Sequence, residues 1–74
     1  MQKPMEWVVT YQLNFVGDIQ EHIVVFINIG MPSEATIKEE IGLQFPEQRL
    51  YLNTYRYVGM YKREIQQKYN EDYE

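Results

Sequence analysis

The side chains of this chain with the clearest potential for chemistry are the tyrosines and basic residues of its last third. Six of the seven tyrosines follow residue 50, and arginine and lysine are interleaved with them. Aromatic rings beside basic groups can stack on single-stranded nucleic acid or hold an anionic ligand, here through Arg56, Lys62 and Arg63. Seven basic against eleven acidic residues give a net charge of −4, which argues against nucleic acid because its binding depends on neutralised phosphates.

No group of residues has the composition or spacing of a catalytic or metal site. His22 is the single histidine and cysteine is absent, so a structural metal site lacks ligands and His22 is expected to be exposed at a strand end. Glu39 and Glu40 are adjacent on an expected helix and point in different directions, so they do not form an acid/base pair. Ser33 has no histidine placed to activate it. We therefore expect no enzymatic activity, cofactor or metal.

Two segments with apolar residues at every second position predict the strands that must position any site. They are residues 7–16 and 21–29, and the turn between them is expected at Gly17-Asp18. A period of two places successive side chains on opposite faces of a sheet. Glycine accepts positive φ and aspartate bonds locally to turn backbone. The sequence therefore predicts an antiparallel hairpin.

The segment after the hairpin predicts an amphipathic helix. Ser33 can accept a free amide proton of the first turn, and Glu34 suits the positive end of the helix dipole. Glu34 also stands four residues before Lys38, a favourable spacing for an ion pair, and Pro46 stops the helix. The expected apolar stripe consists of Ala35, Ile37, Ile41 and Phe45.

Two more elements complete the expected fold. Residues 49–58 are rich in aromatic and β-branched side chains and predict a third strand. Residues 60–69 carry Tyr61, Ile65 and Tyr69 at four-residue spacing and predict a short C-terminal helix. A right-handed crossover places the third strand beside the first. We therefore predict an α+β fold with a three-stranded antiparallel sheet of order 2-1-3, one helix packed on one face and a short C-terminal helix.

The expected core uses the odd-numbered positions of both hairpin strands. It consists of Trp7, Val9, Tyr11, Leu13, Phe15, Ile23, Val25, Ile27, Ile29, Leu50 and Leu52. The other face is expected to carry Val8, Thr10, Gln12, Asn14, Val24, Phe26, Tyr51, Asn53, Tyr55 and Tyr57. Half-apolar surfaces with tyrosine are typical of protein interfaces. Three explanations stay open: the C-terminal helix covers this face with Tyr61, Ile65 and Tyr69, two copies pack it together, or a foreign protein binds it.

Size and charge limit the remaining possibilities. The 74 residues are expected to form one domain, with residues 1–5 and 70–74 frayed, and its small core favours a homodimer. The chain start lacks a secretory signal and the longest apolar run, residues 23–27, is too short to cross a bilayer, so we expect a cytoplasmic protein without a membrane partner. The acidic residues around the helix, Glu39 and Glu40 among them, either imitate the phosphates of DNA or form a solvated face.

Four segments give the chain its layout: residues 8–13, the capped helix 33–41, Gln44-Phe45-Pro46 and the tyrosine-rich expected third strand. This layout, which spans residues 7–58, resembles that of small accessory proteins encoded by tailed phages and other mobile elements of Gram-positive bacteria. Such proteins often bind and disable a host enzyme or defence system. The resemblance therefore implies a host protein as partner, met in the host cytoplasm.

We expect, from these observations, a non-enzymatic protein-binding module that inhibits or modulates a host protein. The expected contact residues are Phe26, Tyr51, Tyr55, Tyr57 and Tyr61 on an aromatic sheet face, or Glu39 and Glu40 on an acidic helix surface. Two alternatives remain open. One is a binder of small ligands or single-stranded nucleic acid through Arg56, Lys62 and Arg63, and the other is a purely structural, self-assembling subunit.

Overall fold

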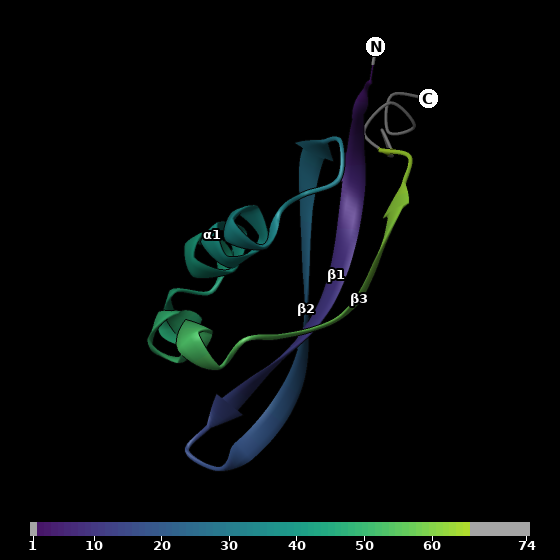
Figure 1. The fold of residues 1–74 in the computed structure, drawn as a ribbon. Coiled ribbons are helices and arrows are strands. Elements are labelled where there is room, and N and C mark those ends of the chain that lie inside the picture. Colours follow the sequence, from purple (N-terminus) through teal and green to yellow (C-terminus); the bar gives the residue numbers. More distant parts are fainter. Residues whose placement is uncertain (1, 66–74) are drawn as a thin grey trace, which may run out of the picture.

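The computed structural model describes residues 2–65. Strands β1 (Pro4–Phe15) and β2 (Asp18–Ile29) are followed by helix α1 (Glu34–Gln44), the 3-10 helix η1 (Pro46–Thr54) and strand β3 (Arg56–Arg63). The strands form one antiparallel sheet in the order β2-β1-β3 (Figure 1). The predicted α+β class, antiparallel pairing and strand order are therefore confirmed.

The two ends of the sheet hairpin differ in detail from the prediction. β1 starts at Pro4, which pairs with Ile29, so the sheet includes part of the segment 1–5 that the sequence predicts to fray. The predicted frayed end 70–74 lies outside the described residues. The turn residues are Val16 and Gly17, with φ of 53° and 88°, one position earlier than predicted. Positive φ at both central residues is the pattern of a tight hairpin turn that matches strand twist.

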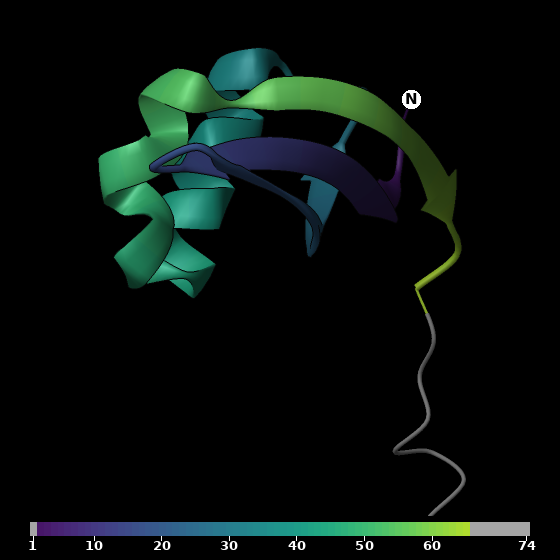
Figure 2. The same ribbon diagram turned by 90° about the horizontal axis from the view of Figure 1, so that it is seen from below.

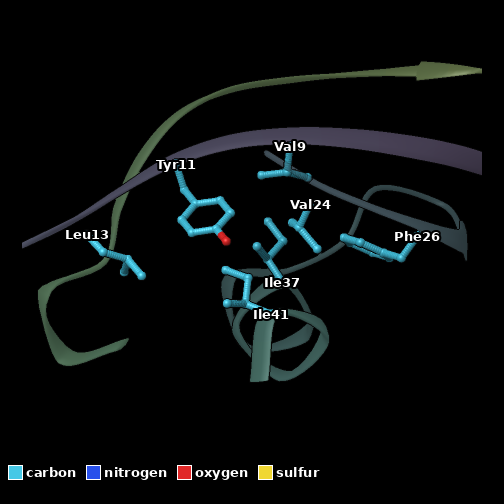
Figure 3. Packing of buried hydrophobic residues seen from close by; sticks show 7 residues of the cluster. All are labelled: Val9, Tyr11, Leu13, Val24, Phe26, Ile37 and Ile41. Atoms are coloured by element: carbon cyan, nitrogen blue, oxygen red, sulfur yellow. The ribbon is translucent and has the colours of Figure 1, made fainter. Parts of the chain in front are cut away.

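This two-residue turn decides which residues of β2 face the core. Phe15 pairs with Asp18, so every odd-numbered residue of β1 stands opposite an even-numbered residue of β2. The buried cluster consequently consists of Val9, Tyr11, Leu13, Val24 and Phe26 of the sheet with Ile37 and Ile41 of α1 (Figure 3). The prediction that Ile23, Val25, Ile27 and Ile29 lie under the helix is wrong, because directly opposite residues share a sheet face.

Helix α1 has the ends that its sequence predicts, although Ala35 of the expected apolar stripe is exposed. Ser33 Oγ accepts a hydrogen bond from the Thr36 amide at 3.2 Å, and Lys38 Nζ lies 3.1 Å from Glu34 Oε2. The helix ends at Gln44, and Pro46 begins the next element. Ile37 and Ile41, spaced one turn apart, are buried against the sheet. The predicted cap, ion pair and stop are confirmed.

The predicted third strand over residues 49–58 is wrong for most of its length. Residues 46–54 form η1 instead, and only residues 56–58 belong to a strand. Gln48, Tyr51 and Leu52 recur at three- to four-residue spacing, which is helical, and they pack toward the core. Leu50, predicted to be buried, is 84% exposed because it points away on the opposite side of this helix.

The predicted C-terminal helix over residues 60–69 is also wrong in its first part. Residues 60–63 belong to β3, where Met60 pairs with Val9 and Tyr61 pairs with Val8. A register shift between Thr10 and Tyr11 marks a bulge in this pairing. β1 thereby gains a neighbour on its second edge. Residues 66–69 lie outside the described part of the chain.

The molecule is a thin, elongated two-layer structure. α1 and η1 lie together on one side of the twisted sheet, and Figure 2 shows them gathered at one end while β1 and β3 continue beyond them. The extents are 49 × 30 × 18 Å and the radius of gyration is 14.4 Å. A compact chain of this length would have a radius of about 11 Å. Within residues 2–65, no helix has the length and apolar composition to cross a membrane.

Candidate functional site

The candidate site is the sheet face that no described helix covers, which we call the open face. Val8 of the central strand lies at its middle. Its partners in the two strand pairings are Val25 of β2 and Tyr61 of β3, so these three side chains lie side by side. By the same register, the open face also includes Ile23, Ile27 and Ile29 of β2.

Large apolar side chains on the open face remain exposed to solvent. Ile23, Ile27 and Ile29 are 55%, 56% and 63% exposed, and Tyr61 is 57% exposed. Val8, surrounded by its cross-strand neighbours, is only 5% exposed. Contiguous apolar patches on a folded domain mark contact sites, because leaving them in water is unfavourable. The open face therefore has the composition of a protein interface.

Each end of the open face carries one glutamate and one arginine. At one end Arg63 Nε donates to Glu6 Oε1 at 2.7 Å, and this bond raises the pKa of Arg63 above its ordinary value. At the other end Gln12 pairs with Glu21 of β2 and with Arg56 of β3. The strand residues of the open face thus carry two glutamates and two arginines, although the whole chain has a net charge of −4.

Four of the five aromatic residues predicted to form the contact surface lie instead on the helix side, and three of them pack in or against the core. Phe26 belongs to the buried cluster. Tyr51 packs on Phe15 with 4.4 Å between ring centroids, and Tyr55 stacks on Tyr11 with 5.9 Å between centroids. The predicted aromatic sheet face is therefore wrong, because the hairpin parity turns Phe26 inward and η1 replaces the strand that was to present Tyr51.

Tyr57 and Tyr61 both belong to β3 but lie on opposite faces. Tyr57 pairs with Tyr11 on the helix side, whereas Tyr61 pairs with Val8 on the open face. The explanation in which a C-terminal helix covers this face fails for Tyr61, which is a strand residue, and for Ile65, which is outside any helix. Tyr69, the third residue of that expected stripe, lies outside the described residues.

The predicted acidic surface lies on the other side of the molecule. Glu39 of α1 is exposed, and Glu40 is half-buried. Glu40 Oε1 accepts a hydrogen bond from Gln44 Nε2 at 3.4 Å, and the neighbouring Glu34 is paired with Lys38. These contacts fit a solvated helix face with local partners. Imitation of DNA by this surface stays a prediction.

The three basic residues predicted to bind ligand or nucleic acid do not form one surface. Arg56 and Arg63 lie at opposite ends of the open face, and Arg63 is paired with Glu6. Lys62 lies on the helix side, 5.9 Å from the centroid of the Trp7 ring. A track of bases would need these cations beside exposed rings. The structure separates them over two faces and buries Tyr51 and Tyr55 in part.

An open hollow lies where the strands extend past the helices. It has a volume of about 480 Å³, and its lining includes Lys3, Met5, Trp7, Met31 and Lys62. The Trp7 ring is fixed because its Nε1 donates to the carbonyl of Asn28 at 3.2 Å. Lys3 Nζ lies 3.0 Å from Glu64 Oε2. Trp7 is only 6% exposed, so the hollow presents to an anion mainly the ammonium groups of its two lysines.

Two buried polar groups complete the helix side. Tyr11 donates its hydroxyl proton to Gln48 Oε1 at 2.7 Å, and burial raises the pKa of Tyr11 to about 12. His22 lies 5.7 Å and 5.9 Å from the Tyr11 and Phe15 rings, between centroids, and its Nε2 is buried without a hydrogen-bond partner among the described residues. His22 is therefore half-buried, and its predicted exposure at a strand end is wrong.

The isoleucines of β2 are the site residues that sequence reasoning missed. The signal was present in the turn, because a two-residue loop places residues of opposite parity across from each other. Comparisons with protein-family models, with curated proteins and with solved structures found no match to this chain. The case for a function therefore depends on the geometry of the site.

Proposed function

We propose that this chain is a non-enzymatic protein-binding module whose contact surface is the open face. The observation that supports the proposal is the apolar row Ile23, Ile27 and Ile29 of β2, more than half exposed, with the exposed Tyr61 on the same face across β1. Aliphatic and tyrosine side chains surrounded by a polar rim are the usual composition of a protein interface. The resemblance to phage accessory proteins adds a host enzyme or defence protein in the host cytoplasm to the possible partners, with inhibition or modulation as the outcome.

The experiment is a capture assay with a tagged copy as bait and a bacterial lysate that also contains untagged chain. Ile27→Lys places a charge within the apolar row of β2 on the open face, and Leu50→Lys is the matched control at an exposed position of η1. We expect wild type and Leu50→Lys to retain a protein that Ile27→Lys loses. Retention of nothing, or retention that is equal in all three baits, contradicts the proposal.

A second candidate function is binding of an aromatic anion in the hollow at Trp7. The observation that favours it is the Lys62 ammonium group 5.9 Å from the centroid of the Trp7 ring, with Lys3 on the same lining. The ammonium groups of Lys3 and Lys62 can hold a negatively charged group, and the Trp7 ring next to Lys62 is close enough to report its binding. Of the three basic residues predicted to bind a ligand, this site contains Lys62, and Lys3 takes the place of Arg56 and Arg63.

The single tryptophan of the chain makes this candidate directly measurable. Adenosine monophosphate is titrated to about 10 mM, a range that covers weak binding, while Trp7 fluorescence is recorded. Saturable quenching that Lys62→Met weakens at least about fivefold, and that Arg56→Met leaves unchanged, supports the site. Linear quenching, or equal quenching in both variants, overturns it.

A further inference from the structure

The composition of the open face favours one particular kind of protein partner. We propose that the open face binds a second copy of this chain, so that two sheets pack face to face around a two-fold axis. This inference rests on the proposed function, since it names the partner of the same surface. In such a dimer each α1 and η1 layer lies on the outside and the two open faces form a shared core.

The area of the open face is close to what a stable dimer needs. Its four large apolar side chains, the three isoleucines and Tyr61, are each a little more than half exposed. A large side chain offers about 200 Å² when fully exposed, so together they present roughly 400–500 Å². Each partner contributes about 800 Å² to a standard interface. The area of the open face approaches this value when Val25, Thr10 and the polar rim are included.

The charge pattern of the open face fits its own copy. Glu6 is neutralised by Arg63 at one end, and Glu21 and Arg56 flank Gln12 at the other. The face is thus balanced on a chain whose net charge is −4, while Glu39 and the other helix acids lie on the opposite side. Two copies can therefore meet without a net repulsion between their faces, and such repulsion is what disfavours mismatched partners. A face built for a strongly charged partner would carry an excess of one sign.

The sequence of β2 also indicates burial on both faces. Residues 23–27 are apolar without a break, whereas a strand with one solvated face alternates apolar and polar residues. Val24 and Phe26 are buried by α1, which accounts for one half of this run. Ile23, Val25 and Ile27 form the other half and lie on the open face. A second sheet packed about 10 Å away would bury them as well.

The sheet edges are less suited to self-association than the face. On β2, Gln44 Nε2 donates to the carbonyl of Val25 at 2.9 Å, so a helix side chain occupies a polar group of this edge strand. On β3, a bulge and the basic residues Arg56, Lys62 and Arg63 oppose pairing with another strand. Bulges and charged side chains are the usual protection of edge strands. Association is therefore directed to the open face.

Light scattering after size-exclusion chromatography tests the inference over a concentration series. We expect the wild type to show twice the 9.0 kDa mass of one chain. Ile27→Lys is expected to run as a monomer with an unchanged far-UV circular dichroism spectrum, and Leu50→Lys as a dimer. A wild type that stays monomeric up to about 500 μM, far above the Kd of a specific dimer, overturns the inference, and so does an Ile27→Lys protein that still dimerises.

Thiol reactivity gives a second measurement that does not depend on a disruptive charge. The chain contains no cysteine, so Ile27→Cys and Leu50→Cys each introduce a single reporter. We expect the Ile27→Cys thiol to react at least about tenfold more slowly at dimer-forming concentration than after dilution, because the interface excludes reagent, while Leu50→Cys reacts equally in both. Equal rates for Ile27→Cys overturn the inference. If untagged chain is not captured in the lysate assay but a host protein is, only this inference fails; if neither is captured, the proposed function fails with it.

Discussion

Ionisation of Tyr11 at alkaline pH is expected to destabilise the fold in a measurable way. The side chain is fully buried, and its hydroxyl donates to Gln48 Oε1 at 2.7 Å. Removal of the phenol from water raises its pKa from the ordinary 10.0 to about 12. The charge of Glu47 adds to this rise. The folded protein therefore resists an ionisation that the unfolded chain undergoes freely.

The sign and size of the effect follow from these two pKa values. The unfolded chain releases the proton near pH 10, and the folded chain retains it until about pH 12. The stabilisation is thus fully present below pH 10 and is lost as the pH rises through 12. At about 1.4 kcal/mol per pKa unit, the free energy of unfolding falls by about 1.4 kcal/mol at pH 11 and by up to about 2.7 kcal/mol above pH 12. A domain of this size has about 4–11 kcal/mol in total.

Urea unfolding of wild type and Tyr11→Phe from pH 8 to pH 12, followed by circular dichroism, measures this difference. Burial also raises the pKa of Tyr55, which is present in both proteins. The difference between the two pH curves therefore isolates Tyr11. At pH 8, Tyr11→Phe is expected to be less stable by about 1–3 kcal/mol, because Gln48 loses its buried partner. Parallel curves above pH 10 would refute the reasoning.

Three substitutions test other parts of the fold by urea unfolding at neutral pH. Ile41→Ala empties a fully buried position and is expected to lower the free energy of unfolding by about 2–5 kcal/mol. Leu43→Ala, at a nearby exposed position, is expected to change it by less than about 0.5 kcal/mol, and equal losses would contradict the packing. Val16→Asn relieves a β-branched residue held at φ 53° and is expected to stabilise the hairpin by about 1 kcal/mol, so a loss would argue against this turn. Ser33→Ala removes the hydrogen bond that Ser33 accepts from the Thr36 amide and is expected to lower the free energy of unfolding by about 1 kcal/mol. An unchanged free energy would show that this cap does not stabilise the helix.

The hairpin and α1 could be predicted because local signals determine them. Alternation of apolar residues identifies β1 and β2, and Ser33, Glu34 and Pro46 mark the ends of α1. The pattern alone does not show which residues of β2 point toward α1, because apolar residues occupy both faces of this strand. The length of the hairpin turn decides which face of β2 is buried, and with a two-residue turn Val24 and Phe26 point toward α1.

The second half of the chain could not be assigned from local preference because tertiary contacts decide it. Aromatic residues over 49–58 favour a strand, but Gln48 forms a buried hydrogen bond with Tyr11, and Leu52 packs on the core from a 3-10 helix. With η1 in that place, residues 56–63 pair with the second edge of β1. The four-residue spacing of Tyr61 and Ile65 imitates a helix, although Tyr61 alternates with Met60 and Lys62 across the sheet.

The same two errors explain why an open sheet face could be predicted and its contact residues could not. The uncovered face follows from one helix layer over three strands, and even-numbered β1 residues such as Val8 and Thr10 lie on it as predicted. Of the tyrosines assigned to it, Tyr51 is in η1 and Tyr57 is on the helix side, whereas Tyr61 does lie on this face. The isoleucines of β2 also lie on it, through the hairpin parity. An aliphatic surface differs from an aromatic one in what it can recognise. Among the described residues it offers only the Tyr61 ring for stacking on bases, and it favours a flat apolar partner, which a second copy of the same sheet provides.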